Sequence, residues 1–293
     1  MKSDGINTGE ISVVVSTYDD PINFVVQCIN SLLPQKKVYE IIIIDSSKKD
    51  EIKKLCHSLN NNKINYIHTP PKGLSDARNK GILVAKRSIV AFTDSDCIID
   101  KNWAENIYLP FEISEDIAIV GGKVLPRWIS KPNSVLYKSA IAQGFYSSFD
   151  MGEKLKEVHQ IFGGNFAINK NLPIDQFFSP ELGRGKGNLL GGEEIQLCKY
   201  VELNNLKIIY NPLAIVIHQI PEERSKLKWM WKRMYYGGIN RAVVGGKPTP
   251  KTVNFISYNL YDVVFLFIFI VPYIYGLLIG FKLLFSRSLM ENK

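Results

Sequence analysis

Four short runs rich in β-branched residues constrain the fold of this chain more than any other feature. Such runs are typical of strands that are buried on both faces of a sheet. They are Ile11–Thr17, Tyr39–Ile44, Ile64–Ile67 and Ile89–Thr93. Helices are expected between them, over about 22–33, 50–59 and 75–86, with Ser75 as the cap of the last one. Strands that alternate with helices predict an α/β domain with a Rossmann-like, mostly parallel sheet flanked by helices.

Two carboxylates, Asp94 and Asp96, follow directly on the run Ile89–Thr93. With one residue between them, both can reach a single hard cation such as Mg²⁺ or Mn²⁺, which prefers oxygen ligands and leaves positions for phosphate oxygens. Ligands of open α/β sheets bind at the carboxyl ends of the strands. The pattern therefore predicts a site for a metal and a diphosphate, although two acids in a solvated turn would give the same spacing.

The second half of the chain is less regular. Strands are expected at 117–120 and 123–128, joined at Gly121 and Gly122, and again at 207–210 and 214–218. A strand interrupted by glycines is expected over 161–168, and a helix from Glu193 to about Leu203. The segment 134–149 fits either a helix or a long loop. The Gly-x-Gly-x-x-Gly pattern is missing, so a dinucleotide is not expected as a ligand.

The charge balance points to an anionic partner. The formal net charge is +8 and the isoelectric point is about 9.1. A membrane surface or a nucleotide would suit this charge. Sequence patterns of the common nucleic-acid-binding modules do not occur, so no nucleic acid is expected as a partner.

The C-terminal part differs from the rest in hydrophobicity. Val263–Phe281 is a run of 19 residues without a charge, close to the roughly 20 that cross a bilayer as a helix. Membrane helices tolerate its Pro272, Gly276 and Gly280. A membrane segment is therefore predicted over 253–285, with a polar tail at 286–293; a buried core helix is the alternative.

The segment 221–252 precedes this run and mixes basic with aromatic residues. This composition suits a helix in the headgroup zone of a membrane, and equally a helix packed on the domain with a solvated basic edge. The remaining residues, 1–220, are predicted to form the α/β domain.

Four motifs follow one another along the chain: the opening strand Val13–Tyr18, Asp45 at the end of the next strand, the helical segment Ala77–Gly81, and Asp94–Asp96. With these motifs in this order, the chain resembles the family 2 glycosyltransferases of GT-A fold. In that family the third motif, the helical one, reads Ala-Arg-Asn-x-Gly. The resemblance covers about 11–241. It implies a GT-A domain that transfers a sugar from a nucleotide diphosphate donor to an acceptor hydroxyl, with inversion.

The resemblance also implies roles at the donor end of the site. Carried over by position, Asp45 and Arg78 would hold the nucleotide base, and Thr17 and Asp19 would lie near the base and the ribose. UDP is weakly preferred over the other nucleotide diphosphates.

The metal ligands implied by the resemblance are acids and a histidine. Asp96 would bind Mn²⁺ or Mg²⁺, Asp94 would lie near the ribose or the metal, and His218 would be a further ligand of the metal or a phosphate. A divalent ion neutralises the charge that develops on a diphosphate leaving group.

The attacking hydroxyl needs a general base. Glu194 aligns with the second acid of the family's Glu-Asp pair and is the preferred base, with the preceding Glu193 as the alternative because this chain has Glu where the family has Asp. The two adjacent carboxyls predict a raised pKa for one of them, since like charges disfavour double ionisation.

The sequence thus predicts a membrane-associated enzyme of lipid-linked glycan or surface polysaccharide synthesis, with its catalytic domain on the cytoplasmic face. Nucleotide sugars are cytosolic, and basic residues precede Val263, in agreement with the positive-inside rule. A sugar nucleotidyltransferase and a non-catalytic nucleotide-sugar-binding membrane protein are the alternatives. A phosphatase of the haloacid dehalogenase type is disfavoured because Ile98 stands where its motif needs Thr.

Overall fold

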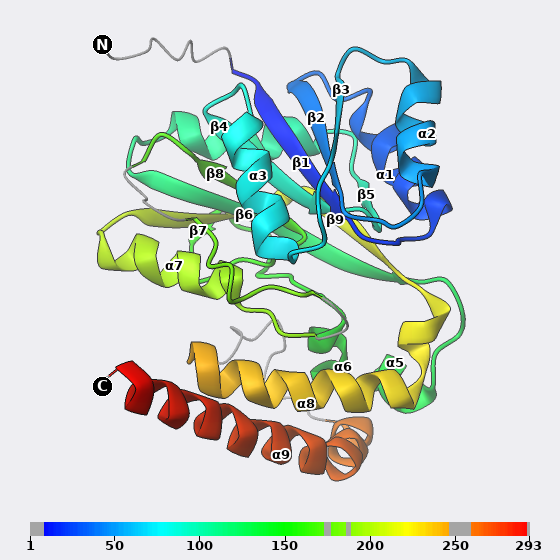
Figure 1. Cartoon of the computed structure of the whole chain (residues 1–293), viewed down its shortest axis with the longest axis vertical. Helices are drawn as coiled ribbons and strands as arrows, with labels where there is room; N and C mark the ends of the chain where they lie inside the picture. The colour runs from blue at the N-terminus through cyan, green and yellow to red at the C-terminus, as the bar shows by residue number, and fades with distance from the viewer. Residues whose placement is uncertain (1–8, 173–176, 186–188, 246–258, 292–293) are drawn as a thin grey trace.

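The computed structural model describes residues 9–172, 177–185, 189–245 and 259–291 of the chain (Figure 1). Within these residues, a nine-stranded sheet forms the centre, helices cover its faces, and two long helices lie side by side at one end of the molecule. The α/β class predicted from the sequence is confirmed.

Strands and helices alternate through the first half, as the buried apolar runs predict. The elements of this half are β1 (Ile11–Thr17), α1 (Ile22–Leu32), β2 (Val38–Asp45), α2 (Glu51–Leu59), β3 (Ile64–His68), α3 (Leu74–Val84) and β4 (Ile89–Asp94). The helix predicted from Ser75 begins one residue earlier, and the residue before it is Gly73. Ser75 does not cap this helix as expected, because its hydroxyl donates to the carbonyl of Leu182 at 2.7 Å.

The second half adds shorter elements and ends in the two long helices. Its elements are β5 (Cys97–Ile99), α4 (Trp103–Tyr108), the 3₁₀ helix η1 (Leu109–Glu112), β6 (Ile117–Trp128), α5 (Ser134–Lys138), α6 (Ala140–Phe145), β7 (Lys156–Glu157), β8 (Asn165–Asn169), α7 (Glu193–Leu203), β9 (Lys207–Ile220), the 3₁₀ helix η2 (Glu222–Ser225), α8 (Leu227–Val244) and α9 (Leu260–Glu291).

The sheet has the order β3-β2-β1-β4-β8-β6-β9-β5, and β7 pairs with β9 outside this path. β3, β2, β1 and β4 are parallel, as are β6 and β9, whereas β8 is antiparallel to both of its neighbours. The sheet is therefore mixed. Its register pairs Thr17 with Asp45 and Ser16 with Asp94, so the carboxyl ends of β1, β2 and β4 meet at one edge.

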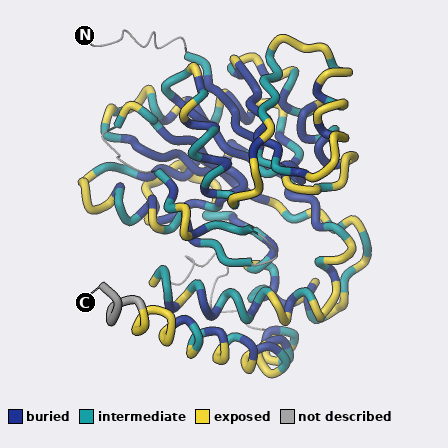
Figure 2. The backbone as a smooth tube through the Cα atoms, in the orientation of Figure 1, coloured by how far each residue is buried: buried dark blue, intermediate teal, exposed yellow. Residues whose placement is uncertain are grey.

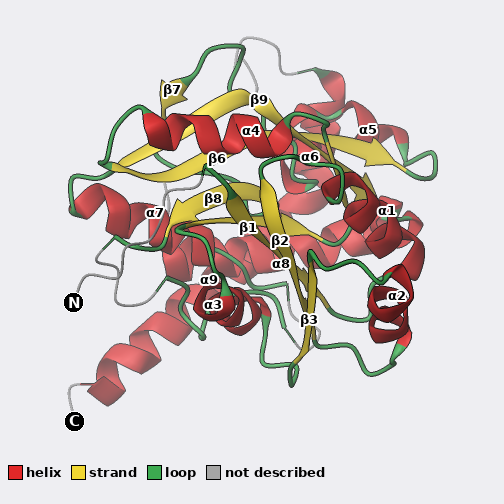
Figure 3. Ribbon diagram, turned by 90° about the horizontal axis from the view of Figure 1, so that it is seen from above, coloured by secondary structure: helices red, strands yellow, loops and turns green. Residues whose placement is uncertain are grey.

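Two hydrophobic clusters cover the two faces of the sheet. One face packs against α1, α2 and α4, and the other against α3 and α7 (Figure 3). A third cluster lies apart from the sheet and joins α5, α6, α8 and α9. Figure 2 shows that the strands are buried along most of their length, while the side of α9 that faces away from the sheet is exposed.

Two predicted breaks between strands are wrong. β6 continues through Gly121 and Gly122 with a shift of register, and β9 continues from Lys207 to Ile220. A Cβ at Gly122 would overlap the carbonyl oxygen of Ala214, so this glycine allows two strands to approach closely. The strand expected over 161–168 begins only at Asn165, and 134–149 contains the short helices α5 and α6.

The predicted apolar run Val263–Phe281 lies inside α9, which continues past Pro272. Among the described residues, Leu260–Ser286 is the segment that is long and apolar enough to cross a membrane by length and composition. α8 packs against the rest of the protein through Met230 and Met234, and both alternatives for this segment stay predictions. The predicted boundary at 252/253 lies outside the described residues.

Candidate functional site

A cavity of 580 Å³ opens at the edge of the sheet where β1 and β4 end. The ends of these strands, the start of α3, the segment 160–164, the start of α7 and one side of α8 form its walls. Six of the nine predicted site residues line it, namely Thr17, Arg78, Asp94, Asp96, Glu193 and Glu194.

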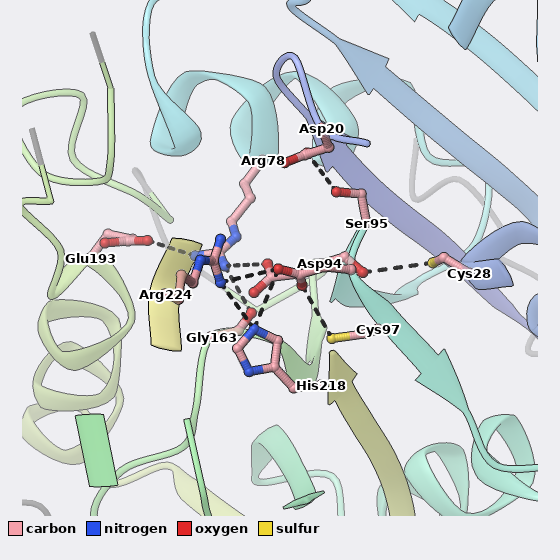
Figure 4. Close-up of polar contacts among 11 residues, drawn as sticks. Asp20, Cys28, Arg78, Asp94, Ser95, Cys97, Gly163, Glu193, His218 and Arg224 are labelled. Carbon is pink, nitrogen blue, oxygen red and sulfur yellow. Dashed lines mark hydrogen bonds and ion pairs between the residues drawn. The ribbon is translucent and has the colours of Figure 1, made fainter. Parts of the chain in front are cut away.

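His218 lies directly behind this wall and contacts Asp96. The two residues meet because β5, which follows the Asp94–Asp96 turn, pairs with β9 and places Cys97 opposite His218. Nε2 of His218 is 3.3 Å from Oδ2 of Asp96, and Nδ1 is 3.1 Å from the carbonyl oxygen of Tyr146. Figure 4 shows His218 beside Arg224. Nδ1–H of His218 donates to that carbonyl, so Nε2 is the ring atom that faces Asp96; it donates to the carboxylate when it carries a proton and offers a lone pair to a cation when it does not.

Arg224, from η2, completes this group. Its Nη1 is 3.2 Å from Oδ2 of Asp96 and 3.3 Å from Nε2 of His218. Burial alone would raise the pKa of Asp96, but His218, Arg224 and Arg184 together outweigh it and hold this pKa well below its usual range. Asp96 is therefore an ionised carboxylate at neutral pH although it is buried.

Asp96 and His218 fit a divalent cation in part. An oxygen and a nitrogen 3.3 Å apart can bind one ion with bonds of roughly 2.1 Å each. Asp94 is directed elsewhere, with Oδ1 at 3.7 Å from Nη2 of Arg78. In the described part of the chain, no group of three His, Cys, Asp or Glu side chains could hold a metal. A cation here would therefore need further oxygen ligands from a substrate, which is usual for Mg²⁺ bound with phosphates.

Arg78 is the centre of a second, fully buried group. Its Nη1 donates to Oε1 of Glu193 at 2.8 Å, and its Nη2 donates to the carbonyl oxygen of Gly163 at 2.8 Å. The guanidinium also lies 5.5 Å from the ring centre of Phe166 and 5.6 Å from that of Phe178. These contacts fix Arg78 between α7 and the floor of the cavity, a position that its predicted role in base binding does not require.

The two adjacent glutamates differ in their partners. Oε2 of each glutamate is buried and accepts no hydrogen bond within the described residues, but Oε1 of Glu193 is paired with Arg78. Burial and the neighbouring Glu194 raise the pKa of Glu193 to about 7, against the opposing effect of Arg78. The structure thus agrees with the prediction that one carboxyl of the pair has a raised pKa.

Two glycines bring the backbone close to these acids. A Cβ at Gly163 would lie 2.7 Å from Oε1 of Glu194, and one at Gly164 would lie 3.0 Å from Oδ2 of Asp94. A side chain at Gly163 would make the carboxylate of Glu194 shift, and one at Gly164 would crowd that of Asp94. The two glycines therefore let this segment lie directly against the acids.

The end of β1 carries a carboxylate that the sequence reasoning missed. Thr17 and Ser95 donate to Oδ2 of Asp20 at 3.0 and 2.6 Å, and all three residues line the cavity. Burial raises the pKa of Asp20, partly offset by the hydrogen bond from Ser95. The sequence offered only Thr17 and Asp19 here, because the motif does not show which of two adjacent aspartates faces inward.

Asp19 and Asp45 are not on the cavity wall. Asp45 is fully buried and accepts hydrogen bonds from Tyr66 and from the backbone of Ser47, each at 2.8 Å. Asp19 accepts from the backbone of Lys48 at 3.0 Å and donates its own N–H to Ser47. Asp19 thus joins the turn after β1 to the turn after β2, and Asp45 ties the latter turn to β3; Ser46, next to Asp45, reaches the cavity.

Three arginines on the cavity wall were also not predicted. Arg184, Arg224 and Arg233 come from segments that follow the motifs by many residues. Burial, with the nearby charge of Arg184, lowers the pKa of Arg233 to about 9, and its Nε has no partner among the described residues. The cavity thus combines acids at the strand ends with basic groups from later segments, a balance that suits an anionic ligand held with a cation.

Comparison with known proteins agrees with this architecture. The family model described as glycosyl transferase family 2 matches residues 12–173, more than half of the chain. A glucosyl-dolichyl phosphate glucuronosyltransferase of Haloferax volcanii is 22% identical over 241 residues, which are 80% of this chain and 77% of that protein. Glycosyltransferase AglE of the same organism is 26% identical over 64% of this chain and 60% of its own length.

Two solved structures share the fold. GalNAc-T7, solved with UDP, GalNAc and Mn²⁺, gives a TM-score of 0.58 at 18% identity over 81% of this chain and 51% of that one. The mannosyltransferase PcManGT of Pyrobaculum calidifontis, solved with GDP-Man and Mn²⁺, gives a TM-score of 0.56 at 15% identity. The match covers 82% of this chain and 66% of that one. The chain therefore belongs to glycosyl transferase family 2, with the GT-A fold that its motifs indicate.

Proposed function

We propose that this glycosyltransferase moves a sugar from a nucleotide diphosphate donor to an acceptor hydroxyl by an inverting reaction that requires Mn²⁺ or Mg²⁺. The observation that carries the proposal is the carboxylate of Glu194. Its Oε2 has no partner in the described residues, and it lies in the same cavity as Asp94 and Asp96. One cavity therefore contains a free base and a group able to bind a cation with a diphosphate.

The diphosphate is assigned to the end of β4. Asp96 and His218 would hold the cation, Asp94 would lie near the ribose or the metal, and Arg224 would contact the anion. The cation would neutralise charge on the leaving diphosphate. Arg224 would add a second positive charge beside the diphosphate once the cation has replaced its guanidinium at Asp96, and this charge stabilises the leaving group as its charge develops.

The nucleotide is assigned to the ends of β1 and β2. Thr17 and Asp20 line the cavity there, and Asp19 and Asp45 hold the two turns in place beneath it. Arg78 remains a proposed contributor to nucleotide binding, through its contact with Asp94. We propose UDP rather than another nucleotide diphosphate only because of the family resemblance.

Glu194 is assigned the role of general base. Glu193 is the weaker choice because its Oε1 accepts a hydrogen bond from Arg78, which ties the side chain to the floor of the cavity. Glu194 follows it at the start of α7; its Oε2, like that of Glu193, has no partner among the described residues, but its side chain is not paired with Arg78. A base with a free lone pair can accept the proton of an attacking hydroxyl.

A lipid-linked acceptor is proposed from the surroundings of the cavity. α6 and α8 form part of its wall, and both pack on the apolar helix α9. One relative is named for transfer to glucosyl-dolichyl phosphate. Because nucleotide sugars are cytosolic and exposed lysines lie along α8, the catalytic domain is assigned to the cytoplasmic face of a membrane.

The test is the incorporation of labelled sugar from UDP-, GDP- and dTDP-sugars, with Mn²⁺, into the lipid fraction of membranes that contain the full-length protein. Glu194→Gln should lower incorporation by about 10²–10⁴ and leave nucleotide binding unchanged. Glu193→Gln is the matched control, since its amide oxygen can still accept from Arg78 and its effect should be smaller. An active Glu194→Gln beside an inactive Glu193→Gln would reassign the base. No incorporation from any donor by the wild type would refute the proposed function.

A further inference from the structure

The contacts of α9 with the catalytic domain limit how this helix can meet a membrane. Its first turn is fixed by Asp262, which is fully buried although it belongs to the most apolar helix of the chain. Oδ1 of Asp262 accepts hydrogen bonds from the hydroxyl of Ser139 at 2.8 Å and from the N–H of Ile141 at 3.1 Å. The start of α9 is therefore fastened to α6, whose residues Ala140 and Ile141 line the cavity.

The middle of α9 is fixed along α8. Gly276 and Gly280 are spaced by four residues and face Gly238 and Ala242, which have the same spacing. A Cβ at Gly276 would overlap the carbonyl oxygen of Tyr235, and one at Gly280 would lie 2.6 Å from the Cβ of Ala242. The two helices thus run side by side in the same direction, in backbone contact, as pairs of small residues allow.

The opposite side of α9 is exposed and apolar. Phe267 is 87% exposed, and Val271 and Leu278 are each 62% exposed. With Val263, Ile270 and Ile274, these residues lie on one side of the helix, away from the buried Phe265 and Phe269. A continuous apolar strip of this length on a protein surface marks contact with a membrane or with another protein.

The charges beside this strip favour a membrane. Lys228, Trp231 and Lys232 are exposed on α8, and Tyr235 of α8 stacks on Tyr275 of α9 with ring centres 5.7 Å apart. Lysines attract anionic headgroups, and tryptophan and tyrosine are common at the boundary between headgroups and hydrocarbon. The net charge of the chain is +8, which favours an anionic membrane. A second copy of the chain would carry the same positive charge and would be repelled.

We propose that α9 lies in the plane of an anionic membrane surface, with its outer side in the bilayer, and does not cross the membrane. α8 is about 27 Å long at 1.5 Å per residue and lies alongside α9. If α9 crossed the bilayer, α8 would therefore also lie inside the bilayer. That would place Lys228, Lys232 and Arg241 in hydrocarbon, at roughly 3 kcal/mol each near the centre.

The shape of the molecule agrees with this orientation. In Figure 1, α9 forms the lower border and α8 lies between it and the sheet domain. A membrane below the molecule in Figure 1 therefore runs parallel to α9. The inference concerns the attachment of the proposed enzyme, and it holds whatever sugar is transferred.

The test is labelling of the two ends of α9 in the full-length protein. Lys138→Cys, beside the first turn of α9, and Ser286→Cys, near its C-terminal end, are made separately. Both residues are exposed and neither lies on the apolar strip, and the four native cysteines among the described residues are all buried. Each variant is bound to sealed vesicles of 70% phosphatidylcholine and 30% phosphatidylglycerol and treated with a membrane-impermeant maleimide. Both cysteines should react fully without detergent. A cysteine at either end that reacts only after detergent is added would show that the helix crosses the bilayer and would overturn the proposal.

A charge introduced on the outer side of α9 gives an independent check. Phe267→Glu should abolish cosedimentation with these vesicles, while Leu203→Glu should not. Leu203 is a matched control because it is 83% exposed and lies on α7, and both variants should keep the melting temperature of the wild type. Unchanged vesicle binding by Phe267→Glu would overturn the proposal. So would a wild-type dimer in solution that Phe267→Glu dissociates, since the strip would then be a contact between two copies.

Discussion

Nη1 of Arg224 lies 3.2 Å from Oδ2 of Asp96, on the carboxylate that we propose as the metal ligand. The same nitrogen is 3.3 Å from Nε2 of His218. A divalent cation between Asp96 and His218 has to replace this guanidinium. Metal binding and the position of Arg224 are therefore coupled, and a diphosphate that draws Arg224 towards itself would favour the metal.

Arg224→Gln should strengthen the binding of Mn²⁺ in the absence of a nucleotide, because the competing positive charge is removed. We expect an increase of about tenfold, equal to about 1.4 kcal/mol. Titration calorimetry with Mn²⁺ measures it, and Arg127→Gln, the loss of an exposed arginine on β6, is the control. Equal Mn²⁺ affinity in both variants would mean that Arg224 does not compete with the metal.

Glu193 should make the stability of the fold depend on pH. Its pKa is about 7 in the folded state against an ordinary value of 4.5, so the folded protein binds more protons than the unfolded chain between these pH values. The contribution to stability is fully present below about pH 4.5 and is lost as the pH rises through about 7.

Urea unfolding of the wild type and of Glu193→Gln between pH 5 and pH 8 tests this dependence. The wild type should lose stability relative to the variant as the pH rises, by an amount on the order of a few kcal/mol. If the difference between the two proteins stays constant over this range, then Glu193 does not have a raised pKa.

The contact between α8 and α9 should tolerate no side chain at Gly276. A valine there would push its Cβ into the carbonyl oxygen of Tyr235 and separate the helices. Gly276→Val should lower the free energy of unfolding by about 1–3 kcal/mol, as expected for overpacking. Thermal unfolding in detergent measures the loss. The control is Gly144→Ala in α6, where an added Cβ meets no atom within 4 Å, and it should not lower the melting temperature. Equal melting temperatures of Gly276→Val and the wild type would contradict this packing of α8 on α9.

Local patterns in the sequence were sufficient to predict the first half of the sheet. Buried β-branched runs mark β1, β2 and β4, and the parallel register then brings Thr17, Asp45 and Asp94 to one edge. The prediction of breaks at Gly121 and between Tyr210 and Ala214 was wrong, because glycine and proline can also occupy irregular positions within a continuous strand.

The site was harder to predict where its contacts join distant segments. Arg224 and Asp96 are 128 residues apart in the chain, and Arg78 and Glu193 are 115 residues apart. No local pattern records such pairs, so the partner of Arg78 and the contribution of α8 to the cavity emerged only from the fold. The pairing of α8 with α9 depends on glycines whose spacing is visible in the sequence, but their partner is not.

The most direct test of the central claim is calorimetric titration of the full-length protein with UDP, GDP and dTDP, each with Mn²⁺ and with EDTA. We predict that at least one nucleotide binds in the presence of Mn²⁺ and that EDTA abolishes the binding. Asp96→Asn should weaken it by about tenfold or more, equal to at least 1.4 kcal/mol. Asp116→Asn, which removes a surface carboxylate paired with Lys207, should leave it unchanged. Equal binding by Asp96→Asn and the wild type, or no binding of any nucleotide by the wild type, would contradict the account.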